Sequence, residues 1–84
     1  MIILTKHAKD RMRERGILRG NIEKTLLNPD TIHRENHKII ASKRPNKAIL
    51  EIDYVIENNK KIVLTCYYLW KFLTIKWQMP YIST

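Results

Sequence analysis

AILEIDYVIENNKKIVLTCYYLW, residues 48–70, is the stretch of sequence that decides the fold. Over residues 48–57 apolar side chains alternate with Glu51, Asp53 and Glu57, which is the period of a strand with one buried face. Asn58-Asn59 then marks a hairpin turn. Residues 61–70 are apolar at nearly every position, which is typical of a strand covered on both faces. The stretch therefore predicts an antiparallel strand pair in the middle of a sheet.

The length of the turn at Asn58-Asn59 decides which side chains share a face of this pair. A two-residue loop would place the carboxylates of one strand among the apolar side chains of the other. A three-residue loop would pair apolar with apolar and gather Glu51, Asp53, Thr65 and Tyr67 on the opposite face. Because an unpaired charge is costly to bury, we expect the three-residue loop and a polar face open to a ligand.

Two helices precede these strands. Thr5 is placed to cap a helix over residues 6–15, and Gly16 suits the left-handed position that ends it. Gly20 and Asn21 supply the break and the cap of a second helix over residues 21–27. Residues 31–35 and 38–42 read as a hairpin. We therefore expect one α+β domain over residues 1–84, with two N-terminal helices on one face of a four- to five-stranded antiparallel sheet, and residues 70–84 as an extension able to add a strand.

The chain is small and strongly basic. Sixteen Lys and Arg residues stand against eight Asp and Glu residues, a net charge of +8. Such a field attracts polyanions, so RNA or a ribosome is the expected partner, although a Lys-rich and Ile-rich genome would give the same composition. The single Cys66 fits a reducing, cytoplasmic setting, and no apolar run reaches the roughly 20 residues that span a membrane.

The first candidate site is a basic stripe on the first helix. His7, Arg11 and Arg15 are spaced four residues apart and share one helix face. Arginine offers a planar fork of donors that matches phosphate, and histidine transfers protons near neutral pH. The stripe is a candidate catalytic set for phosphate chemistry, and the alternative is an ordinary solvated helix face.

A basic turn and the open sheet face supply the other candidates. Lys43, Arg44 and Lys47 surround a proline at the edge of the sheet, where they would contact phosphates or form a plain exposed loop. On the open face Tyr67 would stack on a base, and Asp53 would contact the RNA. Paired cysteines and an HExxH motif are lacking, so no metal is expected. A chain this short buries only a modest core, so no cleft for a large organic cofactor is expected either.

The opening residues also resemble a known family. His7-Ala8-Lys9-Asp10-Arg11-Met12-Arg13-Glu14-Arg15-Gly16-Ile17 is similar to the HAxxRMxxRGI start of a small family of unknown function in bacteria and archaea. Asn28-Pro29-Asp30 and the late strand IVLTCYYL, residues 62–69, match it as well. That family looks like a branch of the RelE/ParE-like toxin superfamily, which implies two helices packed on an antiparallel sheet.

The basic stripe, the strand-rich second half and the resemblance together leave three functions of different class open. The first is a metal-independent messenger-RNA endonuclease of a toxin–antitoxin system, ribosome-dependent or not. In it His7, or alternatively Asp53, would act as the general base. Arg11 and Arg15 would stabilise the developing charge, and Tyr67 would stack on or orient a nucleobase. The second is a basic RNA- or ribosome-binding module without catalysis. The third is an interaction domain that pairs through a sheet edge with a cognate antitoxin or a second copy.

Overall fold

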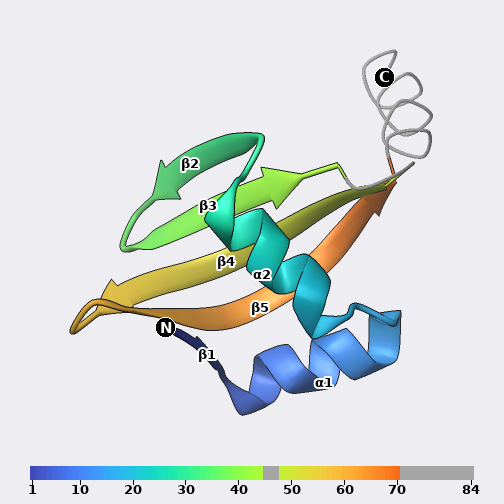
Figure 1. Cartoon of the computed structure of the whole chain (residues 1–84), viewed down its shortest axis with the longest axis horizontal. Helices are drawn as coiled ribbons and strands as arrows, with labels where there is room; N and C mark the ends of the chain where they lie inside the picture. The colour runs from blue at the N-terminus through green and yellow to red at the C-terminus, as the bar shows by residue number, and fades with distance from the viewer. Residues whose placement is uncertain (45–47, 71–84) are drawn as a thin grey trace, which may run out of the picture.

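The computed structural model describes residues 1–44 and 48–70 as two helices on a five-stranded sheet. Figure 1 shows both helices on one side of the sheet. The elements in chain order are β1 (Ile2–Leu4), α1 (Lys6–Arg15), α2 (Arg19–Leu27), β2 (Thr31–Glu35), β3 (Lys38–Lys43), β4 (Ala48–Glu57) and β5 (Lys60–Trp70). The α+β class and the two N-terminal helices are confirmed. The expected extension over residues 70–84 lies outside the described residues, apart from the end of β5.

The sheet is mixed, so the prediction of a purely antiparallel sheet is wrong. Its strand order is β1-β5-β4-β3-β2, and β1 runs parallel to β5 with Ile3 opposite Ile62. The strand pairs β2–β3, β3–β4 and β4–β5 are antiparallel. A parallel pair requires a long connection, and here every other element of the domain lies between β1 and β5.

Local signals determine where α1 begins and ends. The Thr5 hydroxyl accepts a hydrogen bond from the backbone N–H of Ala8 at 3.1 Å, and Gly16 ends the helix with φ of 66°. Both features confirm the prediction. In contrast, α2 begins two residues earlier than expected, because its N-cap is Leu18 and the backbone N–H of Asn21 donates to the Leu18 carbonyl. Gly20 therefore lies inside the first turn of the helix and does not break it.

The β4–β5 hairpin combines a two-residue turn with a bulge. Glu57 pairs with Lys60, and both turn residues, Asn58 and Asn59, have positive φ, so the expected three-residue loop is wrong. Further along, Leu64 has no partner in β4, because Asp53 pairs with Thr65 while Tyr54 pairs with Val63. The extra residue predicted in the loop thus lies in β5.

Beyond the bulge the register is the predicted one. Glu51 pairs with Tyr67 and Asp53 with Thr65, so their four side chains share one face. The other face carries the buried apolar side chains of the sheet and packs on both helices. The core consists of Ala8, Ile17, Ile22 and Leu26 from the helical half and Ile39, Ala41, Leu50, Ile52, Tyr54, Val63 and Cys66 from the strands. The helices therefore cover the apolar face, and no described helix covers the polar face.

Candidate functional site

The basic stripe of α1 divides into a pair and a single residue. Arg11 Nε lies 3.4 Å from His7 Nε2, and the Arg11 guanidinium also forms an ion pair with Glu14. These groups lie on the exposed surface of the helix. Arg15 instead donates to the backbone carbonyl of Cys66 in β5 at 3.4 Å. The structure thus brings His7 and Arg11 together, whereas Arg15 contacts the sheet.

The basic turn after β3 is anchored to the end of α2. Lys43 Nζ donates to the Asn28 carbonyl at 2.9 Å, and the backbone N–H of Arg44 donates to Asp30 at 3.0 Å. Lys43 and Arg44 line a cavity of about 300 Å³ together with Asn21, Lys24 and Thr25 of α2. Lys47, the third predicted member of the turn, lies outside the described residues.

Lys24 is a basic residue of this cavity that the sequence prediction missed. It lies in α2, and the backbone N–H of Asn28 donates to its carbonyl. With Lys43 and Arg44 it places three cations around a cavity that no carboxylate lines, and Lys43 is also ion-paired at 3.7 Å with Asp30 outside that lining. The arrangement suits a phosphate group, the anionic group of the nucleic-acid backbone, which cationic side chains bind. Its proximity to the turn depends on how α2 packs on β3, which has no sequence signal.

The polar face carries a second group of side chains. The Tyr67 hydroxyl donates to Glu51 Oε1 at 2.6 Å. Partial burial, this hydrogen bond and the neighbouring carboxylates raise the pKa of the Tyr67 phenol well above its usual value. Ser42 pairs with Glu51 across the sheet and Thr31 pairs with Ser42, and the hydroxyls of Thr31 and Ser42 contact each other. Tyr67 is therefore a neutral phenol that fixes the Glu51 carboxylate.

Asp53 is the buried charge of the polar face. Its residue is 5% exposed, and its Oδ2 accepts from Lys38 Nζ at 2.8 Å. Its Oδ1 has no hydrogen-bond partner. This ion pair raises the pKa of the Lys38 ammonium. Asp53 of β4 is thus held in an ion pair with a residue of the neighbouring strand β3.

The two sides of the molecule carry opposite charge. Helix α1 has five cations against two carboxylates, and α2 has two against one. All three helical carboxylates pair with arginines: Glu14 with Arg11, Asp10 with Arg13, and Glu23 with Arg19. On the polar sheet face the carboxylates Glu35, Glu51, Asp53 and Glu57 stand against Lys38 and Lys60. The predicted residues therefore fall into a basic helical side and an acidic sheet face, and Tyr67 and Asp53 lie apart from His7 and Arg11.

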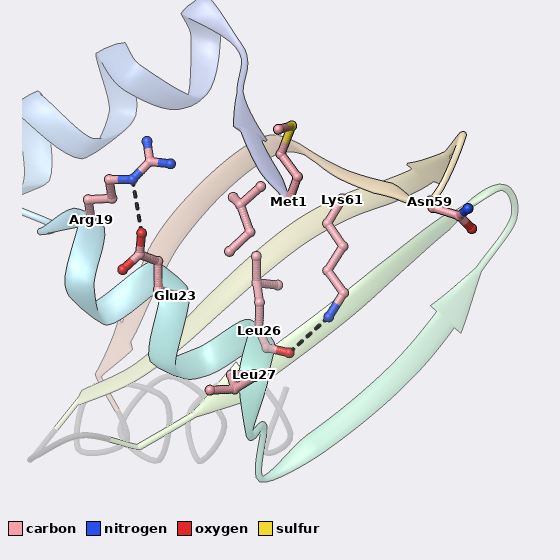
Figure 2. A pocket seen from close by; sticks show the side chains of 8 residues that line it. Met1, Arg19, Glu23, Leu26, Leu27, Asn59 and Lys61 are labelled. Atoms are coloured by element: carbon pink, nitrogen blue, oxygen red, sulfur yellow. Dashed lines mark hydrogen bonds and ion pairs between the residues drawn. The ribbon is translucent and has the colours of Figure 1, made fainter.

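A further cavity, of about 430 Å³, separates α2 from β1 and the β4–β5 hairpin (Figure 2). Met1, Ile2, Leu26 and Leu27 give it an apolar lining. At its rim Arg19 pairs with Glu23 at 3.0 Å, and Lys61 Nζ donates to the Leu26 carbonyl at 3.1 Å. None of the predicted site residues lines this cavity, and its lining suits an apolar group better than a phosphate.

Among the described residues no group of three or more His, Cys, Asp or Glu side chains is placed to hold a metal ion. Cys66 is buried, and its burial raises the pKa of the thiol, which makes it a poor nucleophile. Within residues 1–44 and 48–70, no helix is long and apolar enough to cross a membrane.

Comparison with known proteins identifies one family. Residues 4–68 match the family described as "Domain of unknown function (DUF4258)". No curated protein and no solved structure matches the chain. The matched segment begins at the last residue of β1 and ends within β5, so it includes both helices and nearly the whole described sheet.

Proposed function

The chain belongs to the DUF4258 family, and we propose that it is an RNA-directed protein of the RelE/ParE-like toxin type that binds the RNA backbone through its helical side. The observation that carries this proposal is the separation of charge between the two sides of the sheet. Lys6, Lys9 and Lys24 have no carboxylate partner among the described residues, so they add to the field on the helical side without internal compensation. A field without compensating carboxylates draws in a polyanion and orients it during the encounter.

Two features define the contact surface. On α1, Arg11 offers guanidinium donors beside His7. On α2 and the end of β3, the cavity with Lys24, Lys43 and Arg44 suits a phosphate. Phosphate contacts of this kind hold the strand in register without reading its sequence. A folded RNA or ribosomal RNA segment can contact both features, since they belong to the same side of the sheet.

The test is the salt dependence of RNA binding. Each cation that binds a phosphate of single-stranded RNA adds about 0.7 to the slope of log affinity against log salt. We expect Arg11→Gln and Lys24→Gln each to reduce the slope by roughly the value of one such cation. Lys60→Gln at the β4–β5 hairpin is the matched control, because it removes an equal charge outside the proposed RNA-contact surface. Equal slopes for all three variants would contradict the proposal.

A second candidate function is metal-independent cleavage of the bound RNA, favoured by the contact between His7 and Arg11. Once Arg11 turns from His7 Nε2 to the phosphate, that nitrogen is free to take the proton of a ribose 2′-hydroxyl, whose oxygen then attacks the adjacent phosphorus. The bond from phosphorus to the 5′-oxygen breaks, water protonates that oxygen, and Arg11 stabilises the charge that builds on the phosphate. The products are a 2′,3′-cyclic phosphate and a 5′-hydroxyl end.

Induced expression distinguishes cleavage from binding alone. Cleavage predicts growth arrest and new 5′-hydroxyl ends in cellular RNA, both abolished in His7→Ala, while the RNA affinity of that variant stays within a few-fold of wild type. Intact RNA with an unchanged salt slope would leave the protein as a binding module. A cognate antitoxin and a second copy of the chain stay predictions for its partners.

A further inference from the structure

We propose that the acidic sheet face contains a binding site for a guanine base, at the cavity beside Glu51. The cavity has a volume of about 400 Å³ and is lined by Asp30, Thr31, Ser42, Lys43, Arg44, Ile49 and Glu51. This volume lies within the usual range of small-ligand pockets. The inference rests on the proposed RNA-directed function and adds to it the base that the protein selects.

Glu51 is the acceptor of the site, and Tyr67 holds it in place. The Tyr67 hydroxyl donates to Oε1 at 2.6 Å, and among the described residues no donor contacts Oε2. A carboxylate can accept about four hydrogen bonds, so Glu51 retains capacity at both oxygens. Because Glu51 is half-buried and already oriented, a ligand that donates to it loses little free energy in ordering the side chain.

Guanine matches this acceptor better than uracil does. The Watson–Crick edge of guanine presents a ring N–H beside an amino group, and these two parallel donors match the two oxygens of a carboxylate. Uracil presents one N–H between two carbonyl oxygens, which would face the Glu51 carboxylate and repel it. The Ile49 side chain supplies an apolar surface for the plane of the base.

The position of Lys43 and Arg44 connects this site to the basic side. Both residues line the guanine cavity and also the cavity that contains Lys24. A strand that passes round the end of β3 can therefore keep its phosphates among cations while one base reaches Glu51. This path gives a reason for the carboxylates on the sheet of a protein with a net charge of +8.

The experiment is a titration of the ¹⁵N-labelled protein with guanosine, inosine and uridine 5′-monophosphates, followed through backbone amide shifts. The three ligands carry the same phosphate, and inosine lacks the 2-amino group of guanosine. We expect guanosine monophosphate to shift the amides of Thr31, Ser42, Ile49 and Glu51 and to bind about tenfold more tightly than the other two. The comparison with inosine needs no variant, so it stands even if substitutions impair folding.

Variants then assign the preference to Glu51. Glu51→Gln should bring the affinities for guanosine and uridine monophosphates to within twofold, while Glu57→Gln, a carboxylate of β4 that does not line the cavity, should keep the preference. Equal affinities for the three nucleotides, or shifts confined to other residues, would overturn the inference. In that case salt-dependent RNA binding that still requires Arg11 would leave the proposed function standing. Loss of both would reject the two together.

Discussion

Lys38 Nζ lies 2.8 Å from Asp53 Oδ2. Among the ion pairs of the described residues, this one has a buried carboxylate. The two side chains belong to neighbouring strands and lie diagonally, because Asp53 pairs directly with Ile40. In the other ion pairs the carboxylate side chain is 40–56% exposed, so solvent screens the interaction. The Lys38–Asp53 pair therefore contributes to the register of β3 against β4.

We expect Lys38→Met to lower the melting temperature by roughly 4–8 °C, because it leaves the Asp53 carboxylate buried without a partner. Thermal unfolding followed by circular dichroism measures the change. Lys60→Met is the control, because it removes a cation from the same sheet without breaking an ion pair among the described residues. A double variant that also carries Asp53→Leu should recover most of the loss, since it removes the unpaired charge. Equal melting temperatures for the two single variants would contradict this account.

The Tyr67 phenol should titrate well above the ordinary tyrosine range, because burial and the hydrogen bond to Glu51 raise its pKa. Its folded-state pKa exceeds the unfolded value of 10.0, so the stability it contributes is present below that pH and is lost as the pH rises through the folded-state pKa. Ultraviolet absorbance of the phenolate measures the titration. Glu51→Gln should shift it to lower pH, and Tyr67→Phe should remove it. A Tyr67 titration unmoved by Glu51→Gln would show that the carboxylate does not act on the phenol.

The sequence predicts the elements with local signals and misses those that depend on distant contacts. Thr5 and Gly16 determine the ends of α1, and alternation in residues 48–57 identifies β4. The parallel pairing of β1 with β5 has no local signal, because Ile2 and Lys61 meet only in the folded chain. Leu18, which caps α2 without a side-chain hydrogen bond, likewise gives no sequence signal.

The candidate site shows the same division. The shared face of Glu51, Asp53, Thr65 and Tyr67 follows from alternation and from the cost of burying charge, and the structure confirms it. The expectation that the helices cover the apolar face already places Tyr67 on the face opposite them, and the structure agrees. Spacing also identifies His7 and Arg11 as neighbours, but the predicted catalytic set that joined Tyr67 to them is not brought together.

Thr5 links α1 to the sheet and offers a third prediction. Its hydroxyl accepts from the Ala8 N–H at 3.1 Å and donates to the Val63 carbonyl at 2.8 Å. Thr5→Val removes both bonds at similar volume and should lower the free energy of unfolding by about 1–2 kcal/mol. Urea denaturation measures this loss, and Thr5→Ser should restore most of it. The control is Thr65→Val on the open face, and a loss there as large as in Thr5→Val would contradict the assigned role.

The bulge at Leu64 leads to the last prediction. Removing Leu64 would join Val63 to Thr65, and every β4 residue would keep its present partner, because Leu64 alone in this stretch lacks one. We expect the deletion to fold and to lose about 1–2 kcal/mol, since the Leu64 carbonyl accepts a bond from Thr5 at 3.3 Å. Urea denaturation with a cooperative transition would confirm this.

Deletion of Ala41 in β3 is the matched control, because β3 pairs with β4 without a bulge. Its loss would turn either Ile39 or Ser42 to the wrong face, since a shift of one residue inverts all side chains that follow. We therefore expect this variant to lack a cooperative transition. If both deletions unfold alike, Leu64 is required for the sheet and the bulge is not a simple insertion. If the Leu64 deletion alone folds, the strand pairing between β4 and β5 is enough to place Thr65 and Tyr67 on the polar face, and the extra residue is not needed for it.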